Sequence, residues 1–357
     1  MNNFRVIHLV RNVTSTSMPW NDLYQTHQQI DALSSGYVCS ISNEFKPGLR
    51  LDEDSKKNYF SLNFISAFFV LYKLAITNNK KRNIIIHIHN MSLIPYALFI
   101  RIFGVKCVIN VHNSLVNFNF VQYNLFKLGL PCFDAFIPVS FSVADEVVDA
   151  FPDIKSKVHP IRNGIHIDQL TQINDLHKQT TKNIDVIIIA RFVEQKNVAR
   201  VLSVLSNCNK VNKIVWYGEG IEMESAKNIV SNSSLEPIFE FRGIKPRNEV
   251  LHSIDKSIVY LSLSKWEGIG VANIEALSLP TEVILSDIPP HNELWSDDNL
   301  TLVSLEMKDS DIADIIDYKI HRYKKREKYL LERAAAIRAQ YDLRKLVKEY
   351  IKVYKAC

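Results

Sequence analysis

The stretch that indicates the fold most clearly is SIVYLSLSKWEGIGVANIEAL, residues 257–277. It predicts an apolar β-strand over Ser257–Leu263, then a loop with Gly268 and Gly270, then a helix. Glycines between a strand and a helix let backbone N–H groups approach a phosphate, and the helix N-terminus adds partial positive charge. The chain has only ten glycines in 357 residues. Two of them in one short loop therefore indicate a close approach of the backbone.

A second glycine pair lies upstream in Tyr217-Gly218-Glu219-Gly220, directly after a predicted strand over Lys213–Tyr217. The two loops have two interpretations: tight strand-to-helix turns without a ligand, or turns that cradle a phosphate group. Two such loops in one half of the chain, both beside acidic residues, favour the second interpretation.

The rest of the chain alternates short apolar runs with helix-length segments, which is typical of βαβ units and a parallel sheet. Strands are predicted at Arg5–Val10, Ile84–His89, Lys106–Val111, Ala135–Val139, Ile184–Ala190, Lys213–Tyr217, Ile238–Phe241, Ser257–Leu263 and Glu282–Leu285. Helices are predicted at Asn21–Leu33, Tyr59–Ile76 and Leu93–Phe103, and in the tail Asp311–Cys357. The pattern restarts after Asn163-Gly164, and Thr171–Asn183 has the composition of a linker. These features predict two α/β units, with ligands bound at the carboxyl ends of their strands.

Composition excludes several classes of protein. With 47% hydrophobic and 23% charged residues the chain is neither disordered nor fibrous. Its five cysteines are scattered, which argues against a disulfide framework or a zinc site and favours a reducing cytoplasm. The N-terminus lacks the pattern of a signal peptide, and the apolar stretch 59–76 is too short to span a membrane.

The net charge of +5 arises in the first half of the chain, where residues 1–165 hold 16 basic and 11 acidic side chains. A basic half suits an anionic lipid or a phosphorylated substrate, although a solvated basic face is an equally good interpretation. No basic run interleaved with aromatics is present, so nucleic acid is not indicated as a partner.

Four charged residues are candidates for a site in the second half. Glu267 lies in the glycine loop and Glu275 eight residues later, so one carboxylate is placed to accept from a sugar hydroxyl and the other from a ribose diol. Arg191 and Lys196 follow the strand Ile184–Ala190, and together they could hold a diphosphate and stabilise a leaving group. Each feature alone also fits an ordinary solvated surface.

Taken in order, the motifs of the second half resemble those of the GT-B glycosyltransferases of the family 4 type. The motifs are Ala190-Arg191 to Lys196-Asn197, Tyr217-Gly218-Glu219-Gly220, Phe241-Arg242-Gly243, Glu267-Gly268-Ile269-Gly270-Val271 to Glu275-Ala276, and Ser286-Asp287. Weaker matches in the first half are His87-Ile88-His89, Val111-His112-Asn113, Val139-Ser140 and Asn163-Gly164-Ile165.

The resemblance implies an α/β fold of two facing Rossmann-like domains with a cleft between them. Residues 1–165 would bind the acceptor, residues 166–340 would bind a nucleotide-sugar donor, and a helix at 341–357 would return to the N-terminal domain. The implied reaction is a retaining transfer of a sugar from the nucleotide donor to the acceptor. The implied enzyme needs no metal or other cofactor, because the leaving phosphate takes the acceptor proton and cationic side chains replace a metal ion.

Residue roles follow from the same resemblance. Arg191 and Lys196 would hold the diphosphate, and Glu275 would bind the ribose. Glu267 would bind the donor sugar and His112 would contact it as it is transferred. The donor would also be lined by Gly218, Arg242, Gly243, Gly268, Ile269, Gly270 and Val271.

The sequence departs from the family pattern in two places. The loop after the first strand, Thr14–Pro19, lacks the usual glycine pair, and Pro280-Thr281-Glu282 replaces the usual Gly-x-Pro after Glu275. Two Asp-x-Asp strings, at 52–54 and 309–311, could suggest a metal-dependent glycosyltransferase of another fold, but neither lies in a strand context.

The acceptor is expected to be an oligosaccharide or a lipid-linked glycan in bacterial surface-polysaccharide synthesis (O-antigen, lipopolysaccharide or capsule). UDP-sugars are the favoured donors and GDP-mannose the second choice. The basic, aromatic first half suggests a cytoplasmic protein that associates peripherally with the inner face of an anionic membrane. Two alternatives are a sugar-nucleotide epimerase on the same scaffold and a non-catalytic sugar-nucleotide-binding subunit.

Overall fold

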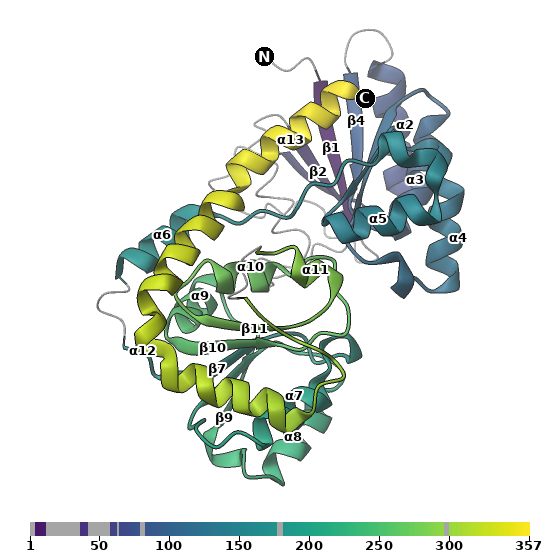
Figure 1. Cartoon of the computed structure of the whole chain (residues 1–357). Coiled ribbons are helices and arrows are strands. Elements are labelled where there is room, and N and C mark those ends of the chain that lie inside the picture. Colours follow the sequence, from purple (N-terminus) through teal and green to yellow (C-terminus); the bar gives the residue numbers. More distant parts are fainter. Residues whose placement is uncertain are drawn as a thin grey trace. The chain divides into compact units, whose positions relative to one another are not determined.

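The computed structural model describes residues 4–11, 36–41, 58–62, 64–78, 83–176, 181–295 and 300–357 (Figure 1). Its contacts divide the chain into two compact units. Unit 1 comprises Met1–Asn163 together with Leu343–Cys357, and unit 2 comprises Gly164–Asp342. The sequence-based boundaries at residues 165 and 340 lie close to these divisions.

Unit 1 is built on a six-stranded parallel sheet with the order β3-β2-β1-β4-β5-β6. The strands are β1 (Phe4–Arg11), β2 (Gly36–Ile41), β3 (Asn58–Leu62), β4 (Asn83–Ile88), β5 (Lys106–Val111) and β6 (Ala135–Pro138). One face is covered by α2 (Phe64–Asn78), α3 (Ile94–Arg101), α4 (Phe120–Gly129) and α5 (Phe141–Ala150), which share one apolar core (Figure 1). The C-terminal helix α13 (Leu343–Ala356) packs with Val6, Ile85 and Val108 in a separate core cluster.

Unit 2 repeats the same topology, with the order β12-β11-β10-β7-β8-β9. Its strands are β7 (Ile184–Ile189), β8 (Ile214–Tyr217), β9 (Phe239–Gly243), β10 (Ser257–Ser262), β11 (Glu282–Ser286) and β12 (Thr301–Val303). Its helices are α6 (Ile167–Leu176), α7 (Val198–Ser206), α8 (Met223–Ser231), α9 (Arg247–Asp255), α10 (Val271–Leu277), α11 (Pro289–Asn292) and α12 (Asp309–Gln340). Figure 1 shows α7, α8 and α12 on one side of this sheet and α9 and α10 on the other. Both units therefore have the strand order of a doubly wound nucleotide-binding fold, which confirms the predicted α/β class.

The central strands are apolar because both of their faces are covered. In β7 the sequence IDVIII buries Val186, Ile187 and Ile188 completely or almost so. Continuous apolar strands of this kind are expected in parallel sheets, whereas a half-exposed sheet would alternate apolar and polar residues. This pattern explains why the central strands were found from the sequence.

Two sequence-based assignments were wrong. The segment 59–76 was predicted as one helix, but Asn58–Leu62 forms β3 and the helix α2 begins only at Phe64. The aromatic run at 59–60 favours a strand, and parallel pairing with β2 secures it. The predicted linker 171–183 is partly helical, because α6 continues to Leu176 and buries Leu170 and Ile173. The predicted helix 21–33 and the loop 14–19 lie outside the described residues.

The turn that departs from the family pattern is held by long side chains of α12. Arg333, which is buried, donates to the carbonyl oxygens of Leu277, Leu279 and Thr281, at 3.3, 2.8 and 2.8 Å. Burial lowers the pKa of Arg333 to about 10. Arg338 donates to the carbonyl oxygen of Ser278 at 2.7 Å. These guanidinium groups satisfy backbone carbonyls after α10 and so replace the missing Gly-x-Pro turn.

None of the helices in the described part of the chain is both long enough and apolar enough to span a bilayer.

Candidate functional site

The predicted site of unit 2 forms at the point where the strand order reverses. The neighbours β7 and β10 lie at the centre of the sheet, and their connections leave toward opposite edges. In open parallel sheets ligands bind outside the carboxyl ends of the strands at such a point. The segment 190–197 follows β7 and the glycine loop 263–270 follows β10. The two strongest sequence motifs therefore lie side by side.

Glu267 is the centre of the contacts between these loops. Its side chain is buried and forms an ion pair with the ammonium group of Lys196. Ser264 Oγ donates to Glu267 Oε1 at 2.8 Å, and Gln195 Nε2 lies 3.4 Å from Oε2. Burial alone would raise the pKa of Glu267, but Lys196 and the hydrogen bond from Ser264 hold it below its usual value. Glu267 is therefore a buried carboxylate that stays ionised.

Gln195 joins the two loops and connects them to Arg191. Its side-chain amide donates to the carbonyl oxygen of Trp266 at 2.9 Å. Its main-chain carbonyl oxygen accepts from the backbone N–H of Lys265 at 2.9 Å. Arg191 is exposed and donates to Gln195 Oε1 at 3.3 Å. Both predicted diphosphate ligands thus lie in the same segment, with Lys196 facing a carboxylate and Arg191 facing solvent.

Glu275 lies deeper than Glu267 and has a different partner. It is 1% exposed, and its Oε1 accepts from Arg247 Nε at 2.7 Å and Nη2 at 2.6 Å. Its second oxygen, Oε2, is buried without a hydrogen-bond partner among the described residues. Burial raises the pKa of Glu275, and Arg247 opposes that shift. This oxygen is a buried acceptor that is left without a hydrogen bond.

A chain of buried hydrogen bonds connects the helix that follows the glycine loop to the neighbouring strands. Tyr260 donates to Asn273 Oδ1 at 2.8 Å, so the amide nitrogen of Asn273 faces His291 Nε2, 2.9 Å away. His291 Nδ1 lies 2.8 Å from the carbonyl oxygen of Ser286, which can only accept. His291 is therefore neutral with its proton on Nδ1, in agreement with a pKa lowered by burial. The chain fixes α10 relative to β10 and β11.

The glycines near this site make room for neighbouring protein atoms. A Cβ on Gly218, at φ +137°, would lie 2.0 Å from the carbonyl oxygen of Ala190, and one on Gly220 would lie 2.3 Å from that of Phe192. A Cβ on Gly270, at φ +73°, would lie 2.4 Å from Asn273 Nδ2. Gly218 and Gly220 need to be glycine because two turns pack together, and Gly270 because its φ is positive. For the pair 218–220 this is the simpler of the two interpretations.

The remaining predicted positions of unit 2 lie around the same edge. Gly268 and Ile269 are buried, and Val271 is the first residue of α10. Gly218 N–H donates to the carbonyl oxygen of Gly243 at 2.9 Å, which brings the ends of β8 and β9 together. Arg242 donates to Tyr217 Oη at 2.7 Å and to Glu240 Oε2 at 2.6 Å. Its guanidinium group is therefore held between Tyr217 and Glu240.

His112, the predicted site residue of unit 1, follows β5 and is half-buried. Its Nε2 is buried without a hydrogen-bond partner in the described part of the chain. His112 lies beside His89, with a ring-centroid distance of 6.0 Å. The two units are described separately, so the approach of His112 to a donor stays a prediction.

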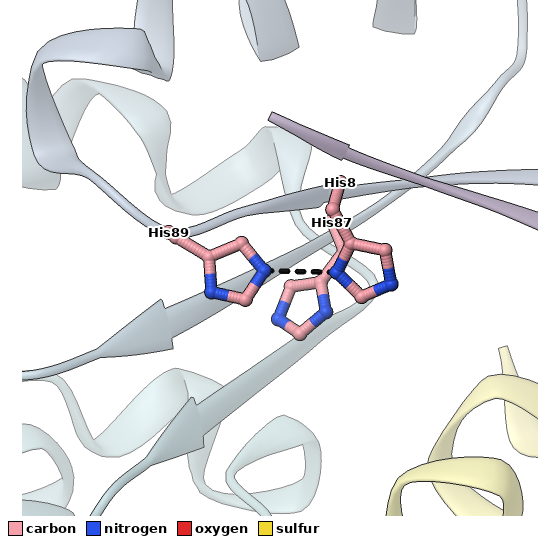
Figure 2. Close-up of side chains that lie close together, drawn as sticks. All are labelled: His8, His87 and His89. Carbon is pink, nitrogen blue, oxygen red and sulfur yellow. Dashed lines mark hydrogen bonds between the residues drawn. The ribbon is translucent and has the colours of Figure 1, made fainter. Parts of the chain in front are cut away.

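Unit 1 also contains a cluster of three buried histidines that the motif analysis only partly noticed. This three-histidine cluster comprises His8 on β1, His87 on β4 and His89 just after β4 (Figure 2). His8 Nδ1 lies 2.9 Å from His89 Nε2. Burial lowers the pKa of all three, that of His87 to about 3.

The three-histidine cluster has the atoms for a metal site but is occupied by hydrogen bonds. One nitrogen of each ring lies within 4.8 Å of the others. However, His87 Nε2 faces Asn110 Oδ1 at 2.9 Å and its Nδ1 faces Tyr354 Oη at 2.7 Å. An ion would have to displace one of these bonds. His87 of the cluster therefore joins α13 to the sheet through Tyr354.

The Asp-x-Asp string at 309–311 has a structural role. Asp309 begins α12, where a carboxylate stabilises the helix N-terminus, and its Oδ1 accepts from Arg200 Nε at 3.1 Å. The string at 52–54 lies outside the described residues.

Sequence reasoning missed four partners of the site: Gln195, Arg247, Asn273 and His291. Their partners are far away in the sequence, as Arg247 and Glu275 are, and no local pattern indicates such pairs. Gln195 alone gave a signal, because it lies within the segment that was singled out for Arg191 and Lys196.

Comparison with known families gives two matches that adjoin each other. Residues 52–169 match the family described as Glycosyltransferase Family 4, and residues 169–334 match Glycosyl transferases group 1. The chain belongs to the family 4 type of glycosyltransferases. Its division between the two matches falls close to the boundary between units 1 and 2.

Two relatives of this glycosyltransferase have informative names. It is 28% identical over 288 residues to the O-antigen biosynthesis glycosyltransferase WclY of Escherichia coli, covering 75% of this chain and 78% of that protein. It is 23% identical over 180 residues to the alpha-maltose-1-phosphate synthase of Mycolicibacterium smegmatis, covering 46% of each chain. Both names describe enzymes that build saccharides.

Solved structures confirm the GT-B fold of the glycosyltransferase. Anabaena HepE in complex with UDP and glucose aligns over 99% of this chain and all of that chain, with a TM-score of 0.80 and 15% identity. The pneumococcal O-GlcNAc transferase GtfA in complex with UDP and GlcNAc aligns over 100% and 99%, with a TM-score of 0.74 and 12% identity. At these identities the likeness concerns the fold.

Proposed function

We propose that the chain transfers a sugar from a nucleotide-sugar donor, with retention of configuration, to a glycan acceptor in bacterial surface-polysaccharide synthesis. UDP-sugars are the favoured donors and GDP-mannose the second choice. UDP is bound in the structures of HepE and GtfA, which supports a UDP-sugar donor. The WclY relative is named for O-antigen biosynthesis, which supports the pathway. We further propose a lipid-linked acceptor and peripheral membrane association on the cytoplasmic side.

The observation that carries this proposal is the ion pair of Lys196 and Glu267 at the strand-order reversal of unit 2. An ammonium group has three donors, and Glu267 uses only one of them. The remaining donors, with the exposed guanidinium of Arg191, suit a diphosphate. Glu267, held ionised, suits a hydroxyl of the donor sugar. Glu275 Oε2 suits a ribose hydroxyl.

In the proposed reaction the bond between the sugar C1 and the diphosphate oxygen breaks, and a bond from C1 to the acceptor hydroxyl oxygen forms on the same face. The acceptor proton passes to the departing phosphate. Negative charge grows on the diphosphate as the bond breaks, so Arg191 and Lys196 stabilise the transition state more than the ground state. Substitution of one such group costs about 10²- to 10³-fold in kcat.

Calorimetry and thermal unfolding with UDP, GDP and their common sugars test the donor class, first without metal and then with Mg²⁺. A ligand at 100 times its Kd should stabilise the protein by about 2.7 kcal/mol. We expect UDP to bind without Mg²⁺. Absence of binding by every nucleotide to folded protein would refute the proposed donor site, and a dependence on Mg²⁺ would refute the metal-independent mechanism.

Matched variants separate a donor role from a structural role. Lys196→Ala should abolish nucleotide binding in a folded protein, whereas Lys227→Ala, on the exposed surface of α8, should leave binding unchanged. Product analysis with donor alone and then with acceptor distinguishes transfer from epimerisation, because an epimerase would convert the donor without any acceptor.

A further inference from the structure

The outer surface of α2 and α4 is unusually apolar for a surface exposed to water. In α2, Ile65, Phe69, Tyr72 and Ile76 are 44 to 72% exposed and recur at helical spacing. The opposite side of α2 contributes Ala67, Leu71 and Ala75 to the core. A helix that is apolar on both sides is normally buried on both sides. The outward side of α2 therefore has few of the polar residues that water favours, with Lys73 as an exposed exception.

The apolar surface continues across the neighbouring helices. α3 lies beside both α2 and α4, and Tyr72 of α2 contacts Phe103, just after α3, at a centroid distance of 5.4 Å (Figure 1). The exposed side chains here are Ile102, Val116, Phe120, Val121 and Leu128, at 62 to 83% exposure. We call the exposed residues of these two paragraphs the α2–α4 surface. Unit 2 has only three comparable side chains among its described residues, Ile221, Ile229 and Tyr318.

The sequence that supplies this surface is mainly basic, although Asp134 pairs with Arg101, and Glu146 accepts from Leu115 N beside Val116. Residues 55–133 contain no aspartate or glutamate, although the chain has 38 of them. The same stretch contains nine lysines and arginines, three of which, at 80–82, directly follow α2 in the sequence. Lys73 and Lys127 are exposed beside the α2–α4 surface. An apolar surface with more cations than anions around it matches an anionic lipid headgroup layer over a hydrocarbon core.

We propose that the α2–α4 surface docks on an anionic membrane, with its aromatic and aliphatic side chains inserted at the headgroup boundary and its lysines on lipid phosphates. The inference rests on the membrane association proposed above and names the face responsible. A second copy of the chain fits less well, because a two-fold interface would place this cationic surface against itself. In the described part of unit 2 the exposed large apolar side chains are only Ile221, Ile229 and Tyr318, and the three-histidine cluster is buried.

Vesicle sedimentation with the full chain tests the proposal. Vesicles of phosphatidylcholine with 30% phosphatidylglycerol should bind the protein, binding should weaken with salt, and pure phosphatidylcholine should bind it poorly. Lys73→Gln and Lys127→Gln should each lower the partition coefficient about five-fold. Phe69→Ser and Phe120→Ser should each lower it roughly ten-fold or more.

Matched controls make the assignment specific. Two substitutions away from this surface should leave vesicle binding unchanged. They are Lys355→Gln, at an exposed position of α13, and Ile221→Ser, at an exposed position of unit 2. If wild-type protein fails to bind anionic vesicles, membrane association itself is overturned, and UDP binding still tests the donor site. If the surface variants bind as well as wild type, the surface assignment is overturned. If they turn a dimer into a monomer by light scattering, the surface is an interface between copies instead.

Discussion

Replacement of Arg247 by methionine tests the buried pair with Glu275 most directly. Methionine keeps the length and most of the volume of arginine but leaves Glu275 buried without its cation. Breaking a buried ion pair by removing one partner costs about 3–5 kcal/mol. We expect Arg247→Met to lower the free energy of unfolding of unit 2 by about this amount at pH 8, where Glu275 is ionised in the unfolded chain.

The loss of stability in Arg247→Met should depend on pH, because Glu275 changes its charge. Burial already raises the folded-state pKa of Glu275, and removal of Arg247 takes away the opposing effect. A carboxyl group whose folded pKa is raised binds more protons in the folded state, so stability falls as pH rises through that range. Protonation at lower pH removes the uncompensated charge, so the loss of stability in the variant should be smaller at pH 5 than at pH 8.

Urea unfolding followed by tryptophan fluorescence measures this effect, because Trp216, Trp266 and Trp295 all lie in unit 2. The double variant Arg247→Met with Glu275→Gln removes both charges and should lose the difference between pH 5 and pH 8. An equal loss at both pH values, or no recovery in the double variant, would refute the reasoning.

Three further predictions concern other parts of the molecule. Gly218→Ala should lower the free energy of unfolding by more than about 3 kcal/mol, because the new Cβ would collide with backbone atoms. Gly104→Ala, at φ +73° with no atom within 4 Å of the new Cβ, should lower it by only about 1 kcal/mol. Similar losses in the two variants would contradict the packing argument. Lys196→Met should raise the pKa of Glu267, so that the free energy of unfolding, measured with urea, falls more steeply with rising pH than in wild type. An unchanged pH profile would count against the ion pair. The three-histidine cluster is stable only when neutral, and its folded pKa values lie below the unfolded value of 6.5. Unit 1 should therefore lose stability as pH falls below about 6.5, by up to about 1.4 kcal/mol per pH unit for each histidine, and thermal unfolding at pH 7.5 and pH 5 that shows no such loss would disprove this.

The sequence predicted the strands that are buried on both faces, because their burial requires a continuous apolar run. The central strands are continuous apolar runs, and their positions follow from the pattern alone. The start of the predicted helix, residues 59–62, is part of a strand, because its aromatic residues fit either structure and only pairing with β2 decides between them. Within the site, Lys196 and Glu267 were singled out separately as donor ligands, but their ion pair depends on two loops that meet at neighbouring strands.

The partners of Glu275 and of the α10 helix could not be predicted, because they lie far away in the sequence. Arg247 precedes Glu275 by 28 residues and His291 follows Asn273 by 18, so neither pair leaves a local pattern. The glycine pairs were interpreted as phosphate turns, yet the atoms that exclude a Cβ belong to Ala190, Phe192 and Asn273. A glycine motif records a crowded backbone and does not say whether a ligand or the protein crowds it.

The assembly of unit 1 from both ends of the chain has a consequence for biosynthesis. Its α13 covers Val6, Ile85 and Val108, and Tyr354 reaches His87, yet residues 343–356 leave the ribosome after all of unit 2. Unit 2 is continuous in sequence and can complete its core first. During synthesis, the apolar side of the first sheet that α13 will cover must wait for the last helix, so this interval is when the nascent chain most needs protection from aggregation.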